Sequence, residues 1–129
     1  MRQIDACEQE LEPGPASVRA ARRAVAQVVA DVVAEDDLDG LLLATSEVVT
    51  NAVEHGGPPI ALVIAKADDR VRIEVRDGSP LLPRPGSPEP TDIRGRGMRI
   101  VEGCADRWGV EPAADGKRVW FELDLRDRL

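Results

Sequence analysis

The sequence is poor in aromatic residues and carries an excess of acidic charge. Of its 129 residues only 2% are aromatic, namely Trp108, Trp120 and Phe121, and there is no tyrosine. The formal net charge is −7 and the sequence pI is about 4.7. A phosphate backbone would repel such a chain, and three aromatic side chains cannot build a platform for stacking bases. We therefore expect no direct nucleic-acid partner.

Metal-ligating and membrane-spanning patterns are also scarce. The chain has two cysteines, Cys7 and Cys104, and one histidine, His55, and it contains no Cys-x-x-Cys motif. These residues provide neither a disulfide framework nor the usual ligand spacing of a zinc site. No apolar run approaches the ~20 residues that a membrane-spanning helix needs, and residues 1–12 lack the pattern of a signal peptide. We expect a cytoplasmic protein without a membrane partner.

Length and composition predict one domain, residues 1–129, with 43% hydrophobic and 32% charged residues, as in ordinary globular proteins. Apolar residues recur at helical spacing from Val18 to Val33, which predicts an amphipathic helix of about five turns. A second helix is predicted to start at Glu35–Asp37, where carboxylates favour a helix N-terminus, and to end at His55–Gly57 before two prolines.

Strand patterns frame these helices. Ile4–Leu11 is predicted to be a short edge strand, and Ile60–Ala67 is nearly all apolar, as in a strand covered on both faces. Arg70–Asp77 alternates between apolar and charged residues, which is typical of a half-buried strand. A short helix is expected from Met98. The segments 108–111 and 118–125 are then expected to form a closing hairpin.

A long loop is predicted at residues 78–97, which hold five of the ten prolines in the chain. Proline disfavours both helix and sheet, and a loop of this length in a small domain is usually functional or disordered. The predicted order is β-α-α-β-β-loop-α-β-β. It indicates an α+β fold, a two-layer sandwich in which helices pack on one face of a mixed, mostly antiparallel sheet.

Three groups of residues that could bind a ligand or take part in catalysis occur in order along the chain. Glu47 and Asn51 lie four residues apart and share one face of the second predicted helix, opposite its apolar stripe. Asp77-Gly78 ends a predicted strand, and Gly95-Arg96-Gly97 leads into the helix that begins at Met98. Taken singly, the first two features are explained by a solvated helix face and a charged strand end. A glycine turn before a helix N-terminus is suited to binding phosphate.

Three segments together resemble the GHKL ATPases, the superfamily of gyrase, histidine kinases and MutL. Ala44–Gly56 is similar to the N box of that superfamily, Val75–Pro80 to its adenine-binding box and Gly95–Val101 to its second glycine box. The three boxes occur in the family order, and the resemblance extends over residues 16–125. Within the superfamily the chain is most similar to the anti-sigma-factor serine kinases, which implies the histidine-kinase-like ATPase fold.

The resemblance implies a role for each matching residue. Asn51 would hold Mg²⁺ through its amide oxygen, and Glu47 would be the general base for the attacking hydroxyl. Asp77 would accept a hydrogen bond from the exocyclic amine of adenine, with Gly78 letting the backbone approach the base. Residues 78–97 would form the ATP lid. The remaining ATP-binding residues would be Gly95, Arg96, Gly97 and Met98. The glycines among them would cradle the phosphates.

Two positions depart from the family pattern. Ser79-Pro80 follows Gly78 where the wider superfamily has a second glycine. Arg118 stands where the family often has a threonine that takes part in the hydrogen-bond network around adenine. This second departure favours weakened use of nucleotide, whereas the presence of Glu47 favours catalysis.

Three functional hypotheses follow from the resemblance. The first is a serine/threonine kinase that transfers the γ-phosphoryl group of Mg-ATP to a serine of an anti-sigma-factor antagonist, a STAS-type protein. In this hypothesis a homodimer also holds a sigma factor. The second is a regulator that binds ATP and sequesters a partner without phosphorylating it. The third is an interaction domain of the same fold that has lost nucleotide binding.

Overall fold

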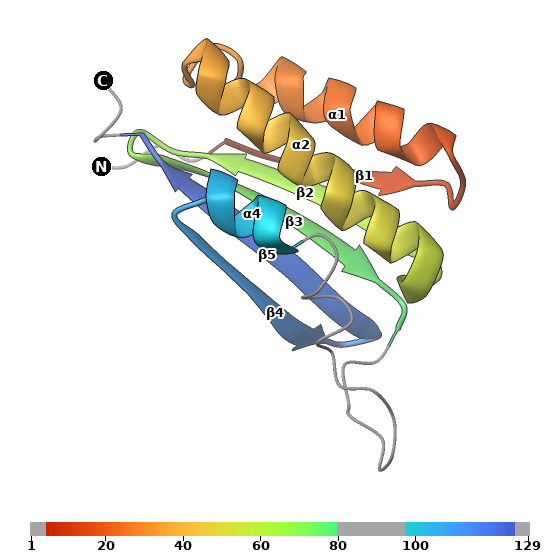
Figure 1. Cartoon of the computed structure of the whole chain (residues 1–129). Helices are drawn as coiled ribbons and strands as arrows, with labels where there is room; N and C mark the ends of the chain where they lie inside the picture. Colours follow the sequence, from red (N-terminus) through yellow and green to blue (C-terminus); the bar gives the residue numbers. More distant parts are fainter. Residues whose placement is uncertain (1–4, 80–97, 126–129) are drawn as a thin grey trace.

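The computed structural model describes residues 5–79 and 98–125 and has two layers (Figure 1). One layer is a sheet of five strands: β1 (Asp5–Leu11), β2 (Ile60–Lys66), β3 (Arg70–Asp77), β4 (Arg107–Ala113) and β5 (Gly116–Asp124). The other layer contains α1 (Ala16–Val29), α2 (Glu35–Asn51) with the π-helical turn η1 (Ala52–Gly56), and α4 (Met98–Cys104). The helices lie on one face of the sheet, so the predicted two-layer fold is confirmed.

The sheet has the strand order β1-β2-β3-β5-β4, and all four neighbouring pairs are antiparallel. The expectation of a mostly antiparallel sheet with β1 at an edge is therefore confirmed. β5 lies between β3 and β4, and its register places Lys117 opposite Asp77. The end of β3 is thereby brought next to the tight turn that joins β4 to β5.

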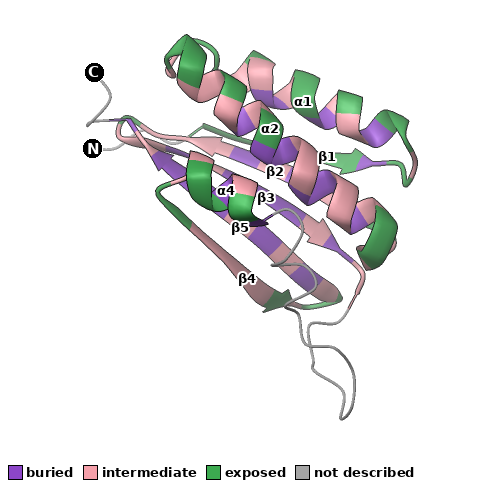
Figure 2. Cartoon of the chain, in the orientation of Figure 1, coloured by how far each residue is buried: buried purple, intermediate pink, exposed green. Residues whose placement is uncertain are grey.

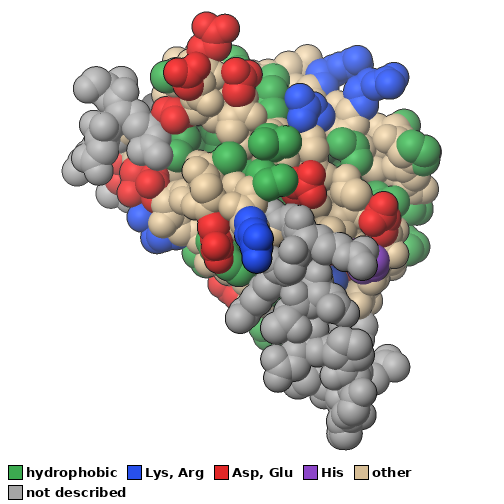
Figure 3. Space-filling view, viewed as in Figure 1, with side chains coloured by type: hydrophobic (Ala, Val, Ile, Leu, Met, Phe, Trp, Pro, Cys, Tyr) green, Lys and Arg blue, Asp and Glu red, His purple; other side chains and the backbone are tan. Residues whose placement is uncertain are grey.

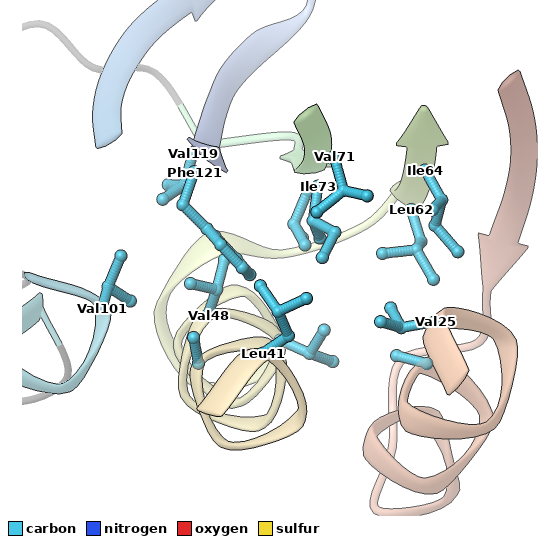
Figure 4. Close-up of a cluster of buried hydrophobic side chains, with 14 of the residues drawn as sticks. Val25, Leu41, Val48, Leu62, Ile64, Val71, Ile73, Val101, Val119 and Phe121 are labelled. Carbon is cyan, nitrogen blue, oxygen red and sulfur yellow. The ribbon is translucent and has the colours of Figure 1, made fainter. Parts of the chain in front are cut away.

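The core lies between the helices and the inner face of the sheet (Figure 2). Alternation along the strands puts every second side chain on this face, so Val75 faces Val119 and Ile73 faces Phe121. From the helix layer, Leu41 of α2 lies toward Ile73 and Phe121, and Val25 of α1 lies toward Leu62 and Ile64 of β2 (Figure 4). Burying a side chain of this size stabilises the fold by about 1.5–3 kcal/mol, so the aliphatic core predicted from the composition supplies most of the driving force.

α2 is the central helix of its layer, because α1 contacts it on one side and α4 on the other. Three carboxylates in its first turn, Glu35, Asp36 and Asp37, complement the positive end of the helix dipole. Acidic side chains gather at the end of the molecule where α1 passes into α2, and basic side chains gather over α1 (Figure 3). The opposite, C-terminal end of α2 continues into η1 beside β3.

Two details of the prediction are wrong. The first helix ends at Val29, although Val32 and Val33 beyond it still pack against the core. The expectation that β2 is covered on both faces also fails, because only alternate residues from Ile60 to Ile64 are buried and those between them are partly exposed. The helices cover one face of the sheet, and the small residues Ala61 and Ala65 lie on the other. In the described ranges, no helix is long and apolar enough to cross a membrane.

The outer face of the sheet carries interleaved charges, which we call the arginine–glutamate network. Its members are Arg70, Arg72, Glu74, Arg76, Arg107 and Glu122. Glu74 Oε1 accepts a hydrogen bond from Arg72 at 3.1 Å and Oε2 accepts one from Arg76 at 2.6 Å. Glu122 accepts one from Arg72 at 3.1 Å and one from Arg107 at 3.0 Å. The Arg72 guanidinium also lies over the Trp120 ring, 4.4 Å from its centroid.

Candidate functional site

A small cavity lies where the C-terminal end of α2 and the start of α4 meet the ends of β3 and β5. It has a volume of about 10 Å³, which is room for about one water molecule. Its walls are formed by Val48, Asn51, Ala52, Val75, Asp77, Met98, Lys117 and Val119. Three residues predicted for the site, Asn51, Asp77 and Met98, therefore line one cavity although they come from three separate elements.

Asn51 is the last residue of α2, and the nitrogen of its side-chain amide is unpartnered in the part of the chain that the structure describes. The Nδ2 atom is buried and has no hydrogen-bond partner among the described residues. Leaving such a group unsatisfied costs about 1–3 kcal/mol, and buried polar groups in folded proteins are nearly always bonded. The prediction placed Asn51 on a face opposite the apolar stripe, yet the residue lines the cavity because η1 and β3 enclose this end of α2. An unpartnered amide here indicates a site that a ligand completes.

Asp77 ends β3, and its carboxylate is enclosed in an ion pair with Lys117. The Lys117 Nζ atom lies 3.0 Å from Asp77 Oδ1 and 2.8 Å from Oδ2. The backbone N–H of Ser79 donates a further hydrogen bond of 2.8 Å to Oδ1. The side chains of Lys117 and Asp77 are only 6% and 2% exposed, so the pair is sealed from bulk water.

Glycines surround Asp77 because no larger residue would fit. A Cβ atom on Gly56 would lie 2.4 Å from Asp77 Cγ, and one on Gly116 would lie 1.9 Å from the Asp77 carbonyl oxygen. A Cβ atom on Gly78 would lie 2.3 Å from the carbonyl oxygen of Pro58. The close approach that Gly78 permits in this structure is therefore to the Pro58 backbone. Its predicted contact with a base stays a prediction.

Glu47 stands beside this group of residues and not within it. It lies one helical turn before Asn51 on α2 and is partly exposed, but it is not among the residues that line the cavity. None of the described residues forms a hydrogen bond or ion pair with it. Residues 80–97 of the predicted lid lie outside the described ranges, and with them Gly95, Arg96 and Gly97.

Lys117 is the site residue that the sequence interpretation missed. A signal for it was present, because Lys117 has the same parity along β5 as Val119, Phe121 and Leu123, which all face the core. A lysine at an inward position needs a buried partner. Arg118, the departure from the family pattern, points to the outer face instead, where its Nε atom lies 3.2 Å from Glu111 Oε2. It is therefore Lys117, and not Arg118, that meets the carboxylate of Asp77.

The donor set of the site fits a magnesium ion that is bound together with a nucleotide. Among the described residues there is no cluster of three or more His, Cys, Asp or Glu side chains that could hold a metal by themselves. Mg²⁺ usually takes one or two protein oxygens and completes its shell with phosphates and water. The Asn51 side chain carries an amide oxygen that can supply one such ligand, whereas its unpartnered Nδ2 atom is a hydrogen-bond donor and suits an acceptor on the nucleotide.

Comparison with known proteins finds a relative in sequence and a solved structure of the same fold. An uncharacterized protein of Streptomyces coelicolor is 32% identical over 82 residues, which cover 60% of this chain and 78% of that protein. The solved structure of the RsbU and RsbW domains of Rv1364c from Mycobacterium tuberculosis aligns with 94% of this chain at a TM-score of 0.71 and 23% identity. This chain spans about a third of that structure, 32% of its length.

A family model supplies the assignment. The model described as the histidine kinase-like ATPase domain matches residues 11–123, which is most of the chain. The match includes α2 with Asn51, the end of β3 with Asp77 and the strand that carries Lys117. The chain belongs to the histidine kinase-like ATPase domain family.

Proposed function

We propose that this domain binds Mg-ATP and transfers its γ-phosphoryl group to a serine hydroxyl of a small protein, forming phosphoserine and ADP. The observation that carries the proposal is the unpartnered amide of Asn51 in the same cavity as the buried carboxylate of Asp77. Membership of an ATPase-domain family supports ATP as the nucleotide. The resemblance to anti-sigma-factor serine kinases supports serine as the acceptor and a STAS-type anti-sigma-factor antagonist as the substrate protein.

Each side chain has a physical task in this proposal. Asp77 accepts a hydrogen bond from the exocyclic amine of adenine, and the Asn51 amide oxygen holds Mg²⁺. The bound ion supplies positive charge that neutralises the phosphate oxygens. Glu47 takes the proton of the serine hydroxyl while the serine oxygen bonds to the γ-phosphorus. The bond between that phosphorus and the bridging oxygen of ADP breaks, and ADP leaves with its electron pair. Because Glu47 is partly exposed, a hydroxyl on another protein can reach it.

The remaining features of the proposal concern assembly and the phosphates. Gly95 and Gly97 cradle the phosphates of ATP, Arg96 and Met98 are further ATP-binding residues, and residues 78–97 act as a lid. The domain works in the cytoplasm as a homodimer that also holds a sigma factor. The solved mycobacterial structure contains an RsbU and an RsbW domain. This combination supports a regulatory role for the domain.

A regulator that binds ATP without catalysis is the second candidate, and one observation favours it. Glu47 neither lines the cavity nor bonds to any described residue. A catalytic group is normally held in position by a supporting shell of contacts. Without such support at Glu47, the domain would bind ATP and sequester its partner without phosphorylating it.

Radiolabelled ATP and a STAS-type antagonist protein test the proposal. We expect the wild type to transfer label, Glu47→Ala to bind ATP normally but transfer label ~10²–10⁴-fold more slowly, and Asn51→Ala to lose Mg²⁺-dependent ATP binding. Asp39→Ala, which removes an exposed carboxylate on the same helix, is the matched control and should change neither property.

The outcomes separate the hypotheses. ATP binding without transfer would support the non-catalytic regulator. Absence of saturable binding at millimolar Mg-ATP would reject both nucleotide-dependent functions and leave the interaction domain. Undiminished transfer by Glu47→Ala would remove the proposed role of that residue.

A further inference from the structure

The ammonium group of Lys117 occupies an unusual place for a lysine. Its side chain is buried on the inner face of β5, at a position that continues the inward row of Val119, Phe121 and Leu123. The same side chain lines the cavity that contains Asn51 and Asp77. Long cationic side chains usually extend their charged end into water. Lys117 instead brings its charge to the nucleotide cavity proposed above.

The hydrogen bonds between Lys117 and Asp77 leave unused donors on Lys117 and unused acceptor positions on Asp77. An ammonium group has three donors and no acceptor, and a carboxylate has about four acceptor positions. Within residues 5–79 and 98–125, Asp77 Oδ1 receives bonds from Ser79 N–H and Lys117, whereas Oδ2 receives only the contact from Lys117 at 2.8 Å. Lys117 makes hydrogen bonds to Asp77 and to no other described residue. The pair therefore presents an acceptor and a donor next to each other.

Adenine carries the complementary pair of groups. Its exocyclic 6-amino group is a donor, and ring nitrogens that accept hydrogen bonds flank it on either side, N1 on one edge and N7 on the other. We propose that Lys117 is a specificity-determining residue of the nucleotide site and donates a hydrogen bond to one of these ring nitrogens while Asp77 accepts one from the 6-amino group. This inference rests on the proposed function, because it requires that the cavity receives ATP.

Burial explains why this contact would be strong. In the protein interior a hydrogen bond from a charged donor is roughly twice as strong as one between neutral groups. The cavity of about 10 Å³ has room for one water beside the pair, and the ring nitrogen takes the place of that water. A purine is much larger than this volume, so a wall must move. Met98 is the most adaptable wall residue, because its unbranched thioether side chain has three rotatable bonds.

Binding of base analogues to the full chain tests the inference. The ligands are ATP, 1-deaza-ATP, 7-deaza-ATP and the triphosphate of purine riboside, which lacks the 6-amino group, each with Mg²⁺ in competition with a fluorescent nucleotide. We expect the wild type to bind one of the two deaza analogues about tenfold or more weakly than ATP, as for loss of a charged hydrogen bond. In Lys117→Met this penalty should vanish, while the penalty for the missing 6-amino group remains.

Lys66→Met is the matched control, because Lys66 is the other lysine of the chain and its ion pair with Asp31 is exposed. It should keep every ratio of the wild type. Binding of both deaza analogues within about twofold of ATP by the wild type would overturn the inference and leave the proposed function standing. Failure of ATP itself to bind would overturn both. The wild-type series can overturn the inference even when Lys117→Met does not fold.

Discussion

The two faces of the sheet handle buried charge in opposite ways. On the outer face, Glu74 and Glu122 are almost covered, yet each accepts hydrogen bonds from two arginines. On the inner face, Asp77 has one cationic partner among the described residues, Lys117, and both side chains are buried. One system is a network with several partners for each carboxylate, and the other is an isolated pair.

The difference indicates which function the outer network and the inner pair each suit. When a network loses one member, the neighbours still find opposite charges, so the fold is protected but no carboxylate is available to a ligand. An isolated buried pair has no replacement for either partner, and a buried ion pair contributes little net stability because desolvation opposes the attraction. Its retention beside an unpartnered amide is better explained by ligand recognition than by stability.

Removal of Lys117 should have the largest effect on stability. Lys117→Met leaves the Asp77 carboxylate buried without its cation, and breaking a buried pair in this way costs about 3–5 kcal/mol. That is a large part of the 5–15 kcal/mol by which a typical domain is stable. Urea unfolding of the variant should show the loss as a lower midpoint with an unchanged slope.

Two further variants show whether the loss comes from the stranded charge. Lys66→Met breaks an exposed pair, with Nζ 3.1 Å from Asp31 Oδ1, and should cost less than about 1 kcal/mol. Adding Asp77→Leu to Lys117→Met removes the stranded carboxylate and should recover most of the loss. Equal losses for Lys117→Met and Lys66→Met would contradict the isolation of the inner pair.

The backbone around Asp77 should give the next largest effect. Gly116→Ala places a Cβ atom 1.9 Å from the Asp77 carbonyl oxygen, so strands β3 and β5 must shift apart at the site. Overpacking of this kind typically costs 1–3 kcal/mol. Gly103→Ala is the control, because nothing lies within 4 Å of its Cβ position in α4, and it should be neutral or stabilising by about 0.4–1 kcal/mol. Similar unfolding midpoints for the two variants would show that the strand ends are not tightly held.

The order and type of the elements could be predicted because local signals dominate them. Alternation in β3, helical spacing in α2 and glycine with proline after η1 each act within a few residues of the chain. The burial of β2 on one face only could not be predicted from such local signals. Its apolar outer residues depend on which face the helices occupy, and that is a property of the assembled sheet.

The site was predictable only where a motif marked it. Asn51 and Asp77 were expected from the family resemblance, and they do line one cavity. Alternation along β5 marks Lys117 as an inward residue, but the identity of its partner depends on the register that sets β5 against β3, a contact between residues 40 positions apart. Arg118, its neighbour, departs from the family pattern, but strand alternation turns that side chain to the other face.

A substitution in the arginine–glutamate network should have the smallest effect on stability. The pH dependence of that effect identifies its cause. Burial alone would raise the pKa of Glu74, but hydrogen bonds from Arg76 and Arg72 outweigh it and hold the pKa below its ordinary value of 4.5. A carboxyl group with a lowered pKa binds fewer protons when folded, so its contribution is present above pH 4.5 and is lost as the pH falls further. Glu74→Gln should cost about 1–2 kcal/mol at pH 7.

The same variant should approach the wild type in stability as the pH falls below 4.5 and through the lowered pKa of Glu74, where the wild-type carboxylate becomes protonated as well. Glu8→Gln is the control, since Glu8 is 61% exposed and lies 3.5 Å from the same Arg76, and it should change stability by less than about 1 kcal/mol. Urea midpoints measured from pH 7 to pH 3 test both expectations. A difference between Glu74→Gln and wild type that stays constant with pH would mean that packing, and not the shared charge of the network, accounts for the buried glutamate.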